Sequence, residues 1–409
     1  MRFNAPSLPD DAAFALLTAC GDWPTGECRN EKVRACFAAL EGETSDFLRL
    51  VNRHHMSMLA AEALRQAGLE PPPQLLCVEE DQKVRALGLT GEAIRVLDRL
   101  ETAGIDAMLL KGPVLSQTLY GDPTMRQSID LDLLVDWADF QRSISLLQDA
   151  GYVLHGGEPP WNDWRIEPWR RMAKDVTLVN PAKRIALELH HRLKSPAELL
   201  PGLGIEQATQ RISFFGKSLA AFPPEDLFAY LCAHAATSMW DRLKWLADLR
   251  ALLSERSLDE IEDWQDHAAR LGIERCTALG LLLCHRIWDQ QVPQSLQTRA
   301  RDDPQIARLV EASWQRLRGP ERHHSSLANS LQRRHLIQLR DDAAYRRAQS
   351  AEFLYDREIL ERFKMPRTLR GLYFLLRIGV FVRRKFSLIR QPDRTQSPDQ
   401  SSIRQKRPA

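Results

Sequence analysis

The sequence predicts an α+β protein, in which a mixed sheet with flanking helices lies between an N-terminal helical cap and a C-terminal all-helical domain. Runs with the alternation of strands occur only in the middle of the chain, whereas apolar residues recur at helical spacing before and after it. With 409 residues, 44% of them apolar, the chain is long enough for roughly two or three folding units. We place the cap at residues 1–80, the mixed core at 81–222, the helical domain at 223–390 and a tail at 391–409.

The N-terminal part shows helical spacing that is interrupted once. Phe14 and Leu17 lie on one helical face, and the prolines at 71–73 end the pattern because proline lacks the amide hydrogen that a helix interior needs. A further helix is predicted over residues 81–103, where Gly104 is the expected C-terminal cap.

A strand, a tight turn and a helix are expected next. Residues 105–110 form an apolar run that ends at Lys111 and Gly112. Pro113 suits the first turn of a following helix, because its fixed φ angle is helical and its missing amide hydrogen would have no partner there. We expect the backbone of this turn to face the same sheet edge as Asp130.

The most regular strand pattern is DLDLLV at residues 130–135. Strict alternation puts Asp130, Asp132 and Leu134 on one face of the strand and the remaining apolar side chains on the other. We expect only the second face to belong to the core. A helix is predicted over residues 138–150.

Two further runs, at residues 175–179 and 185–189, are separated by Asn-Pro-Ala-Lys. This turn composition predicts an antiparallel hairpin. In the second strand, Glu188 and His190 share a face. From Pro224 onward the sequence shows only helical periodicity, which predicts the all-helical domain.

The charges of the chain are distributed unevenly. Lys and Arg number 56 against 54 Asp and Glu, but residues 361–409 carry a net charge of +10, so the rest carries −8. A nucleic-acid partner is therefore disfavoured, because the basic residues do not follow a groove. The basic stretch at 383–385 either contacts anionic lipid or a partner or is a solvated helix end, and the polar tail is predicted to be disordered.

The cysteine pattern indicates a reducing compartment. Seven cysteines without a CxxC pair predict neither a disulfide framework nor a zinc knuckle. No signal-like apolar run opens the sequence, and the longest apolar stretch is interrupted by Arg377. We therefore expect a cytoplasmic protein.

The strand carboxylates carry the predicted chemistry. Asp130 and Asp132 would repel each other and raise each other's pKa unless a divalent cation lay between them. Oxygen ligands of this kind suit Mg²⁺ or Mn²⁺, which accept substrate phosphates in their remaining positions. With Glu188 as a third carboxylate, the set predicts a two-metal site for phosphoryl or nucleotidyl transfer. The alternative is a solvated strand end.

Several segments together resemble a bacterial family of nucleotidyltransferases within the polymerase-beta-like superfamily. The acidic-x-His strand of that family is similar to Glu188-Leu189-His190, and its helical-domain signature is similar to His234 with residues 242–249. The resemblance covers roughly residues 48–253, and its main segments are LKGPVL at 110–115, LYGD at 119–122, RQSIDLDLLV at 126–135 and the later Gly151-Tyr152.

This resemblance implies a minimal nucleotidyltransferase core that moves a nucleoside monophosphate from an NTP to an acceptor and releases pyrophosphate. Asp130 and Asp132 would bind both metal ions, Mg²⁺ or Mn²⁺, and Glu188 would bind the ion nearer the acceptor. The acceptor is an unidentified small molecule, peptide or protein. A catalytically inactive nucleotide-binding or scaffold protein on the same fold is the alternative.

One departure from the superfamily concerns the phosphates. Its usual Gly-Ser is replaced by Lys111-Gly112, and the serine often found directly before the first aspartate is Ser128, two positions early. Amides at a helix N-terminus attract phosphate, Gly112 allows close approach, and Lys111 could supply a charge. The alternative for Lys111 is a solvated strand-end lysine.

Other residues have two interpretations each. Arg126 is a second phosphate candidate, or it forms a structural salt bridge to Asp122 or Asp130. His190 orients Glu188, touches the acceptor or packs, and only one of His190 and His191 can point at the site, since neighbours on a strand alternate.

The long connection that holds three tryptophans, Trp161, Trp164 and Trp169, is another open case. It is either a lid that stacks on a base or a cover for the sheet, and the second interpretation is favoured.

Overall fold

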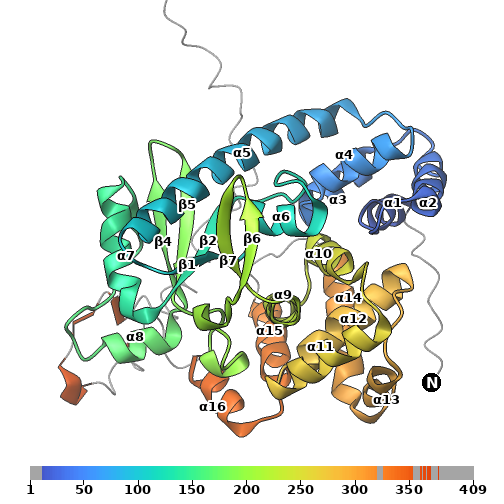
Figure 1. Cartoon of the computed structure of the whole chain (residues 1–409). Helices are drawn as coiled ribbons and strands as arrows, with labels where there is room; N and C mark the ends of the chain where they lie inside the picture. Colours follow the sequence, from blue (N-terminus) through green and yellow to red (C-terminus); the bar gives the residue numbers. More distant parts are fainter. Residues whose placement is uncertain are drawn as a thin grey trace, which may run out of the picture.

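A computed structural model describes residues 12–319 and 326–352, together with residues 360–361, 363–364, 366–369 and 376 (Figure 1). The predicted α+β class is confirmed, since this part of the chain forms helices α1 to α16, a five-stranded mixed sheet and a separate two-stranded sheet. The tail at 391–409, the basic stretch at 383–385 and Arg377 lie outside the described residues.

The five-stranded sheet has the order β1-β2-β5-β4-β3. Strands β2 and β5 run parallel, and the other neighbouring pairs are antiparallel. The predicted hairpin is confirmed in β4 and β5, and the DLDLLV strand is β2. The bounds are β1 Ala107–Leu109, β2 Asp130–Val135, β3 Val153–His155, β4 Asp175–Asn180 and β5 Ile185–His190.

Both faces of the sheet are covered. On one face, Leu131 and Leu133 pack in a cluster with residues of α5 (Pro73–Thr102) and α7 (Trp137–Asp149). On the other face, Leu134 packs in a cluster with the N-terminal helices and with α9 to α14. The expectation that only one face of β2 is core was therefore wrong, because the helical part covers the carboxylate-bearing face.

The N-terminal helices precede one long helix. Helix α5 begins at Pro73 rather than at the predicted Asp81, because proline is tolerated in the first helical turn. It crosses the predicted boundary between residues 80 and 81, and the domain boundaries remain a prediction. The helices before it are α1 Ala12–Cys20, α2 Glu27–Ala38, α3 Ser45–His54 and α4 Ser57–Gln66.

The C-terminal helices share a core with the N-terminal ones, and both groups lie on the same side of the sheet in Figure 1. The rings of Phe14 and Trp314 meet edge to face, and Nε1 of Trp288 donates a hydrogen bond to the carbonyl of Thr18 at 2.9 Å. The bounds are α9 Pro224–Thr237, α10 Leu243–Leu253, α11 Leu258–Arg270, α12 Glu274–Trp288, α13 Gln294–Asp302, α14 Pro304–Arg318, α15 Ser326–Gln338 and α16 Ala343–Glu352.

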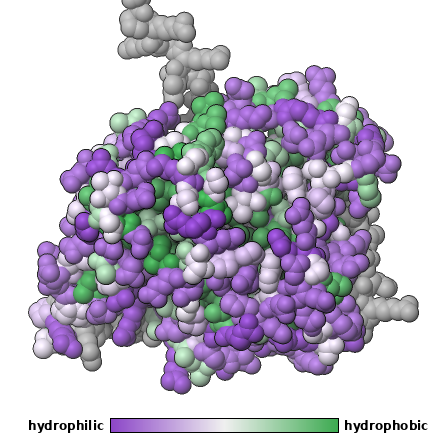
Figure 2. Space-filling view, in the orientation of Figure 1, coloured by the Kyte–Doolittle hydropathy of each residue, from purple (hydrophilic) through white to green (hydrophobic). Residues whose placement is uncertain are grey.

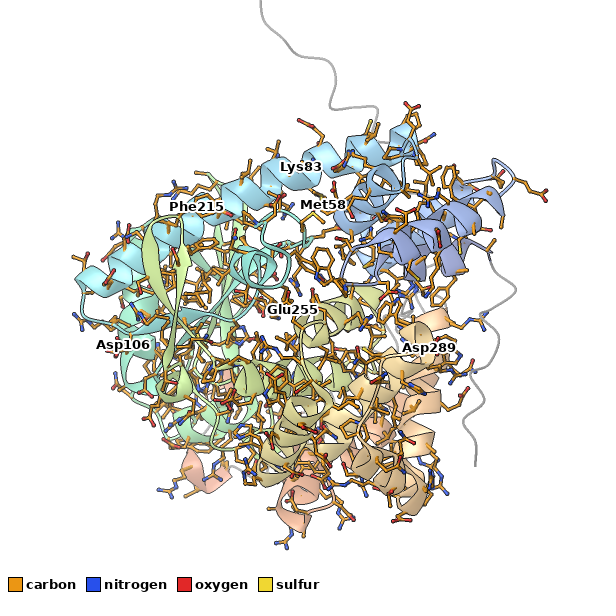
Figure 3. All side chains as sticks on the ribbon, turned by 45° about the vertical axis from the view of Figure 1, so that its right-hand side comes forward. Met58, Lys83, Asp106, Phe215, Glu255 and Asp289 are labelled. Carbon is orange, nitrogen blue, oxygen red and sulfur yellow. The ribbon has the colours of Figure 1, made fainter. Side chains whose placement is uncertain are left out.

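A second hairpin, of β6 (Gln210–Phe214) and β7 (Lys217–Ala221), was not predicted. Its two-residue turn has positive φ at Phe215 and Gly216, as tight hairpins require. An ion pair from Lys217 to Asp98 ties it to α5, and Figure 3 shows Phe215 at its tip beside that helix. Hydrophobic residues gather on the surface in this region of Figure 2.

The tryptophan connection covers the sheet. Trp169 lies in helix α8 (Ile166–Met172), is fully buried and packs in the cluster of α5 and α7. Trp161 and Trp164 are partly buried against the same cluster. These positions favour the interpretation that the connection covers the sheet over the interpretation that it is a lid for a bound base.

The cysteines and the apolar character of the helices bear on two further expectations. All seven cysteines are unpaired, as predicted. Within the described residues, none of the helices has the length and apolar character needed to cross a bilayer.

Candidate active site

The pairing of the two parallel strands sets the geometry of the site. Asp132 lies directly opposite Glu188, and Asp130 lies opposite Ala186. On the other side of β5, the antiparallel strand β4 places Asp175 opposite His190. Because alternate residues share a face, the acidic side chains of β2 and the side chains of Glu188 and His190 project into the same space.

Three of these side chains converge. Nε2 of His190 lies 3.4 Å from Oδ1 of Asp132 and 3.4 Å from Oε2 of Glu188, while its Nδ1 lies 3.8 Å from Oδ2 of Asp175. One ligand atom from each of Asp132, Glu188 and His190 lies within 4.8 Å of the other two. This trio is called the carboxylate–imidazole cluster below.

The imidazole of His190 is a buried polar group in need of a partner. Neither of its ring nitrogens has a well-formed hydrogen bond within the described part of the chain, although the side chain is almost fully buried. Buried polar atoms without partners are rare, and an unplaced ion is one of the usual reasons. The two carboxylates and this imidazole therefore fit a divalent cation.

His191 points to the opposite side of the sheet, as the strand alternation predicts. Its ring packs edge-on against Trp137 and Phe140, and its Nε2 lies 2.8 Å from the carbonyl oxygen of Ala173. Only His190 belongs to the site.

The two aspartates of β2 have opposite electrostatics. Burial, followed by the neighbouring carboxylates of Asp132 and Glu188, raises the pKa of Asp130. Burial also opposes ionisation of Asp132, but Lys111 and His190 outweigh it and hold the pKa of Asp132 well below its usual range. Asp132 is thus the member of the pair that is held in its charged form. Asp130 is the member whose charged form is destabilised by the neighbouring carboxylates.

Lys111 is placed by the end of β1. The amide of Leu110 donates a hydrogen bond to the carbonyl of Asp132 at 3.0 Å, which extends the pairing of β1 with β2 beyond the strand. The Nζ atom of Lys111 then lies 3.0 Å from Oδ1 of Asp132. The alternative of a solvated strand-end lysine was wrong, because this side chain is 13% exposed and paired.

Gly112 adopts a backbone that other residues rarely adopt. It has φ 76° and ψ −145° and is the N-terminal cap residue of α6 (Pro113–Tyr120). A Cβ atom there would lie 3.9 Å from the nearest other atom, the carbonyl oxygen of Asp130. Glycine is therefore required by the backbone angle and not by crowding. The turn therefore lies beside the backbone of Asp130.

Arg126 and Ser128 are buried beside the site. The Nε atom of Arg126 lies 2.8 Å from Oδ2 of Asp248 on α10, and its Nη1 lies 3.3 Å from Oγ of Ser128. The hydroxyl of Tyr120 donates to the other oxygen of Asp248 at 3.1 Å. The salt bridge expected with Asp122 or Asp130 is thus made with Asp248, and it fastens the core to α10. Phosphate binding by Arg126 and Ser128 remains a prediction.

Further cations lie near the carboxylates of β2 and β5, and no pattern in the sequence pointed to them. Lys174 is paired with Asp175, and its Nζ lies 3.6 Å from Oε2 of Glu188. Lys244, near the start of α10, donates to the carbonyl of Gln127 at 3.3 Å. Burial, with Arg126 close by, lowers the pKa of Lys244 to about 7.

Helix α9 carries two buried groups whose electrostatics reflect the charges of the neighbouring strands. Burial and the charge of Asp132 raise the pKa of the Tyr230 hydroxyl well above its usual range. Burial and the nearby ammonium groups of Lys111 and Lys194 hold the pKa of His234 well below its usual range. His234 stacks edge-on against Trp245 at 5.5 Å between ring centroids, so it is a packed histidine that faces a positive site.

Most of the chain matches a known protein family. Residues 41–289 match the family described as “Uncharacterised nucleotidyltransferase”. The matched region begins before α3, contains the whole mixed sheet and ends after α12. No curated protein matches the chain significantly.

Proposed function

The chain belongs to the uncharacterised nucleotidyltransferase family, and on that premise we propose that it moves a nucleoside monophosphate from an NTP to an acceptor, with a divalent cation and with release of pyrophosphate. The observation that carries this proposal is the carboxylate–imidazole cluster, whose ligand atoms lie within 4.8 Å of one another around a buried histidine.

The residues proposed to hold the ion are Asp132, Glu188 and His190, with Asp130 next to them on β2. Carboxylates and waters suit both Mg²⁺ and Mn²⁺, whereas an imidazole ligand is more typical of later transition metals. A bound divalent cation would supply charge neutralisation at the phosphates and would lower the pKa of an acceptor hydroxyl.

The protein's own residues bind and orient the substrates in this proposal. Lys111 pairs with phosphate oxygens once the charge of Asp132 is engaged elsewhere. The first amides of α6, after Gly112 and Pro113, have no helical partner and can donate to phosphate. Glu188, whose side chain is one-third exposed, is assigned to the acceptor.

A second candidate function is nucleotide binding without catalysis. The observation that favours it is the direct ion pair between Lys111 and Asp132, at the position where the superfamily usually carries Gly-Ser. In such a scaffold, the lysine would replace the ion. The two candidates differ in one respect, because only the enzyme releases pyrophosphate.

Thermal unfolding with each of the four NTPs tests the proposal. We expect at least one NTP to raise the melting temperature in the presence of Mg²⁺ or Mn²⁺ and not in EDTA, and we expect Asp132→Asn to lose the shift. A shift of equal size in EDTA would support the scaffold. No shift with any NTP would contradict both candidates.

The acceptor class stays a small molecule, peptide or protein, and the cytoplasm is the proposed location because all seven cysteines are unpaired. Pyrophosphate release in the presence of cell extract fractions would identify the acceptor fraction.

A further inference from the structure

The long helix α5 has an apolar strip on its outer side. Val84 is 65% exposed and Leu87 is 56% exposed, although the opposite side of the helix packs in the core. Gly88 and Gly91 continue the strip, because residues three and four positions apart share one face of a helix. These four residues are called the α5 strip below. In Figures 1 and 3, α5 runs along the upper edge of the described part of the chain.

The fold of one chain does not account for the two glycines. Glycine is one of the poorest helix formers, so two of them in a helix interior lower stability. Neither Gly88 nor Gly91 has a positive φ angle that would require glycine. Among the described residues, a Cβ atom at Gly88 would meet nothing within 4 Å, and one at Gly91 would meet only the guanidinium of Arg95, at 3.6 Å. The two glycines therefore leave room for a partner that packs closely on the helix from outside.

An apolar side chain of the neighbouring hairpin enlarges this surface. Phe215, at the tip of β6 and β7, is exposed and lies beside α5 (Figure 3). The ion pair from Lys217 to Asp98 fixes the hairpin there. Figure 2 shows hydrophobic residues gathered on this part of the surface. Contiguous exposed apolar residues mark interaction surfaces, whereas scattered ones are normal.

Charged residues of opposite sign flank the α5 strip on the same helix face. Glu80 and Asp81 lie toward the N-terminal end of the helix, and Arg95 and Arg99 lie toward its C-terminal end. All four are exposed. The face is therefore acidic at one end, apolar in the middle and basic at the other end.

This pattern is complementary to itself. Glu80 lies seven residues before Leu87, and Arg95 lies seven residues after Gly88. The α5 strip has the same symmetry, since its first residue lies three positions before Leu87 and its last lies three positions after Gly88. A two-fold axis through this midpoint would place Glu80 of one copy opposite Arg95 of the other, and each large side chain of the strip opposite a glycine.

The charges also select the direction of pairing. Two antiparallel copies bring acidic ends against basic ends, whereas two parallel copies would bring like charges together. An anionic lipid surface would be repelled by Glu80 and Asp81. A second copy of this chain is therefore the occupant that the surface fits.

We propose that the α5 strip is a homodimer interface, on which α5 of a second copy packs antiparallel about the midpoint between Leu87 and Gly88. The inference does not depend on the proposed function. The interface would nevertheless border the candidate active site, because Nη2 of Arg85 donates to the carbonyl of Ile129 at 2.9 Å, and Ile129 directly precedes Asp130.

The test is sedimentation velocity of the full chain over a series of protein concentrations. We expect the wild type to pass from monomer to dimer as the concentration rises. Leu87→Glu should raise the dimer Kd at least tenfold, because it would bury an unpaired charge in the interface. The matched control is Leu331→Glu, which changes a leucine of α15 that is 57% exposed, and it should associate like the wild type.

Charge reversal tests the antiparallel pairing. Glu80→Arg and Arg95→Glu should each weaken the dimer, because each change brings like charges together. The double variant that carries both changes should recover the dimer, since every such contact is then reversed. High salt should reduce these differences, because the charges are exposed.

A further variant keeps the charges unchanged. Arg95 also pairs with Glu92 within the helix at 2.8 Å, so circular dichroism must show that Arg95→Glu still folds. If it does not fold, Gly88→Leu takes its place. Leucine favours the helix but fills the space that Leu87 of the second copy would occupy, so this variant should lose the dimer without a fall in melting temperature.

Several results would overturn the inference. A wild type that stays monomeric at the highest concentration would do so, and so would a dimer that is as tight in Leu87→Glu as in the wild type. An equal loss of association in Leu331→Glu would show that the effect is not specific to α5. A double variant that does not recover would exclude the antiparallel pairing and with it the proposed interface.

Discussion

The ammonium nitrogen of Lys111 lies 3.0 Å from Oδ1 of Asp132, the same oxygen that lies 3.4 Å from Nε2 of His190. In the proposed function, the lysine and the ion would compete for this carboxylate oxygen. Metal binding would release Lys111 toward the substrate phosphates, which couples the arrival of the ion to the formation of the phosphate site.

The first prediction follows from this competition. Lys111→Met should bind Mn²⁺ more tightly than the wild type in the absence of nucleotide, since Asp132 loses its competing partner, and should bind Mg²⁺–NTP more weakly. Titration calorimetry measures both affinities. If the two affinities change in the same direction, the competition is absent.

The two aspartates of β2 should respond differently to the same substitution. Without metal, Asp130→Asn should raise the melting temperature, because Asp130 suffers repulsion from two carboxylates. Asp132→Asn should lower it, because Lys111 is then left buried without its partner. Both variants should lose transfer activity while their circular dichroism stays native. Equal changes in melting temperature in the two variants would show that Asp130 and Asp132 do not differ in their electrostatic surroundings.

Glu188→Gln should reduce turnover more than NTP affinity. Glu188 is assigned to the acceptor side, so its loss should affect the chemical step, whereas the nucleotide keeps its contacts with Lys111 and α6. Pyrophosphate release and NTP titration provide the two numbers. A fall in NTP affinity as steep as that of Asp130→Asn would refute the acceptor-side assignment.

Gly112→Ala should weaken NTP binding. The same substitution at Gly42 is the control for the loss of stability that alanine causes at positive φ. Gly112 has φ 76° and Gly42 has φ 87°, and a Cβ atom would meet no close contact at either position. Alanine in these positive-φ conformations costs roughly 1–3 kcal/mol of stability, so both variants should unfold at lower urea concentration. Only Gly112→Ala should also lose NTP affinity, because Gly42 lies in the connection between α2 and α3.

The wild type without metal should become more stable, relative to Lys194→Met, as the pH rises above neutrality. Burial and two like charges lower the pKa of Lys194 from 10.5 to about 7. The folded state then binds fewer protons than the unfolded state, so the stability penalty is full below about pH 7 and fades as the pH rises toward 10.5.

Urea unfolding between about pH 6 and pH 9 measures this effect. Lys194→Met should be more stable than the wild type at the acidic end, and its advantage should shrink by at most about 1.4 kcal/mol per pH unit above neutrality. A difference that does not change with pH would mean that Lys194 does not titrate in this range.

Local patterns predicted the strands that carry the site. The alternation in DLDLLV identified β2, and the Asn-Pro turn identified the β4–β5 hairpin, but neither pattern shows that β5 pairs with β2 and so brings Glu188 opposite Asp132. The sequence left the role of His190 open, because a strand pattern gives the face of a residue but not its contacts. Its position close to both Asp132 and Glu188 is seen only in the structure.

Long-range contacts could not be predicted in this way. Asp248 pairs with Arg126 from 122 positions away, and Lys194 depends on Thr237 of another helix. The second hairpin also escaped detection, since its strands QRISF and KSLAA have five residues each and half of these residues are polar. Its Phe-Gly turn was the one signal that could have found it.

The most direct test of the account is Mn²⁺ binding followed by electron paramagnetic resonance of the free ion. The carboxylate–imidazole cluster predicts saturable binding by the wild type, loss of that binding in Asp132→Asn, and unchanged binding in Asp149→Asn, which removes an exposed carboxylate at the end of α7. Mn²⁺ binding that is the same in Asp132→Asn as in the wild type would contradict the central claim that this cluster is the metal site.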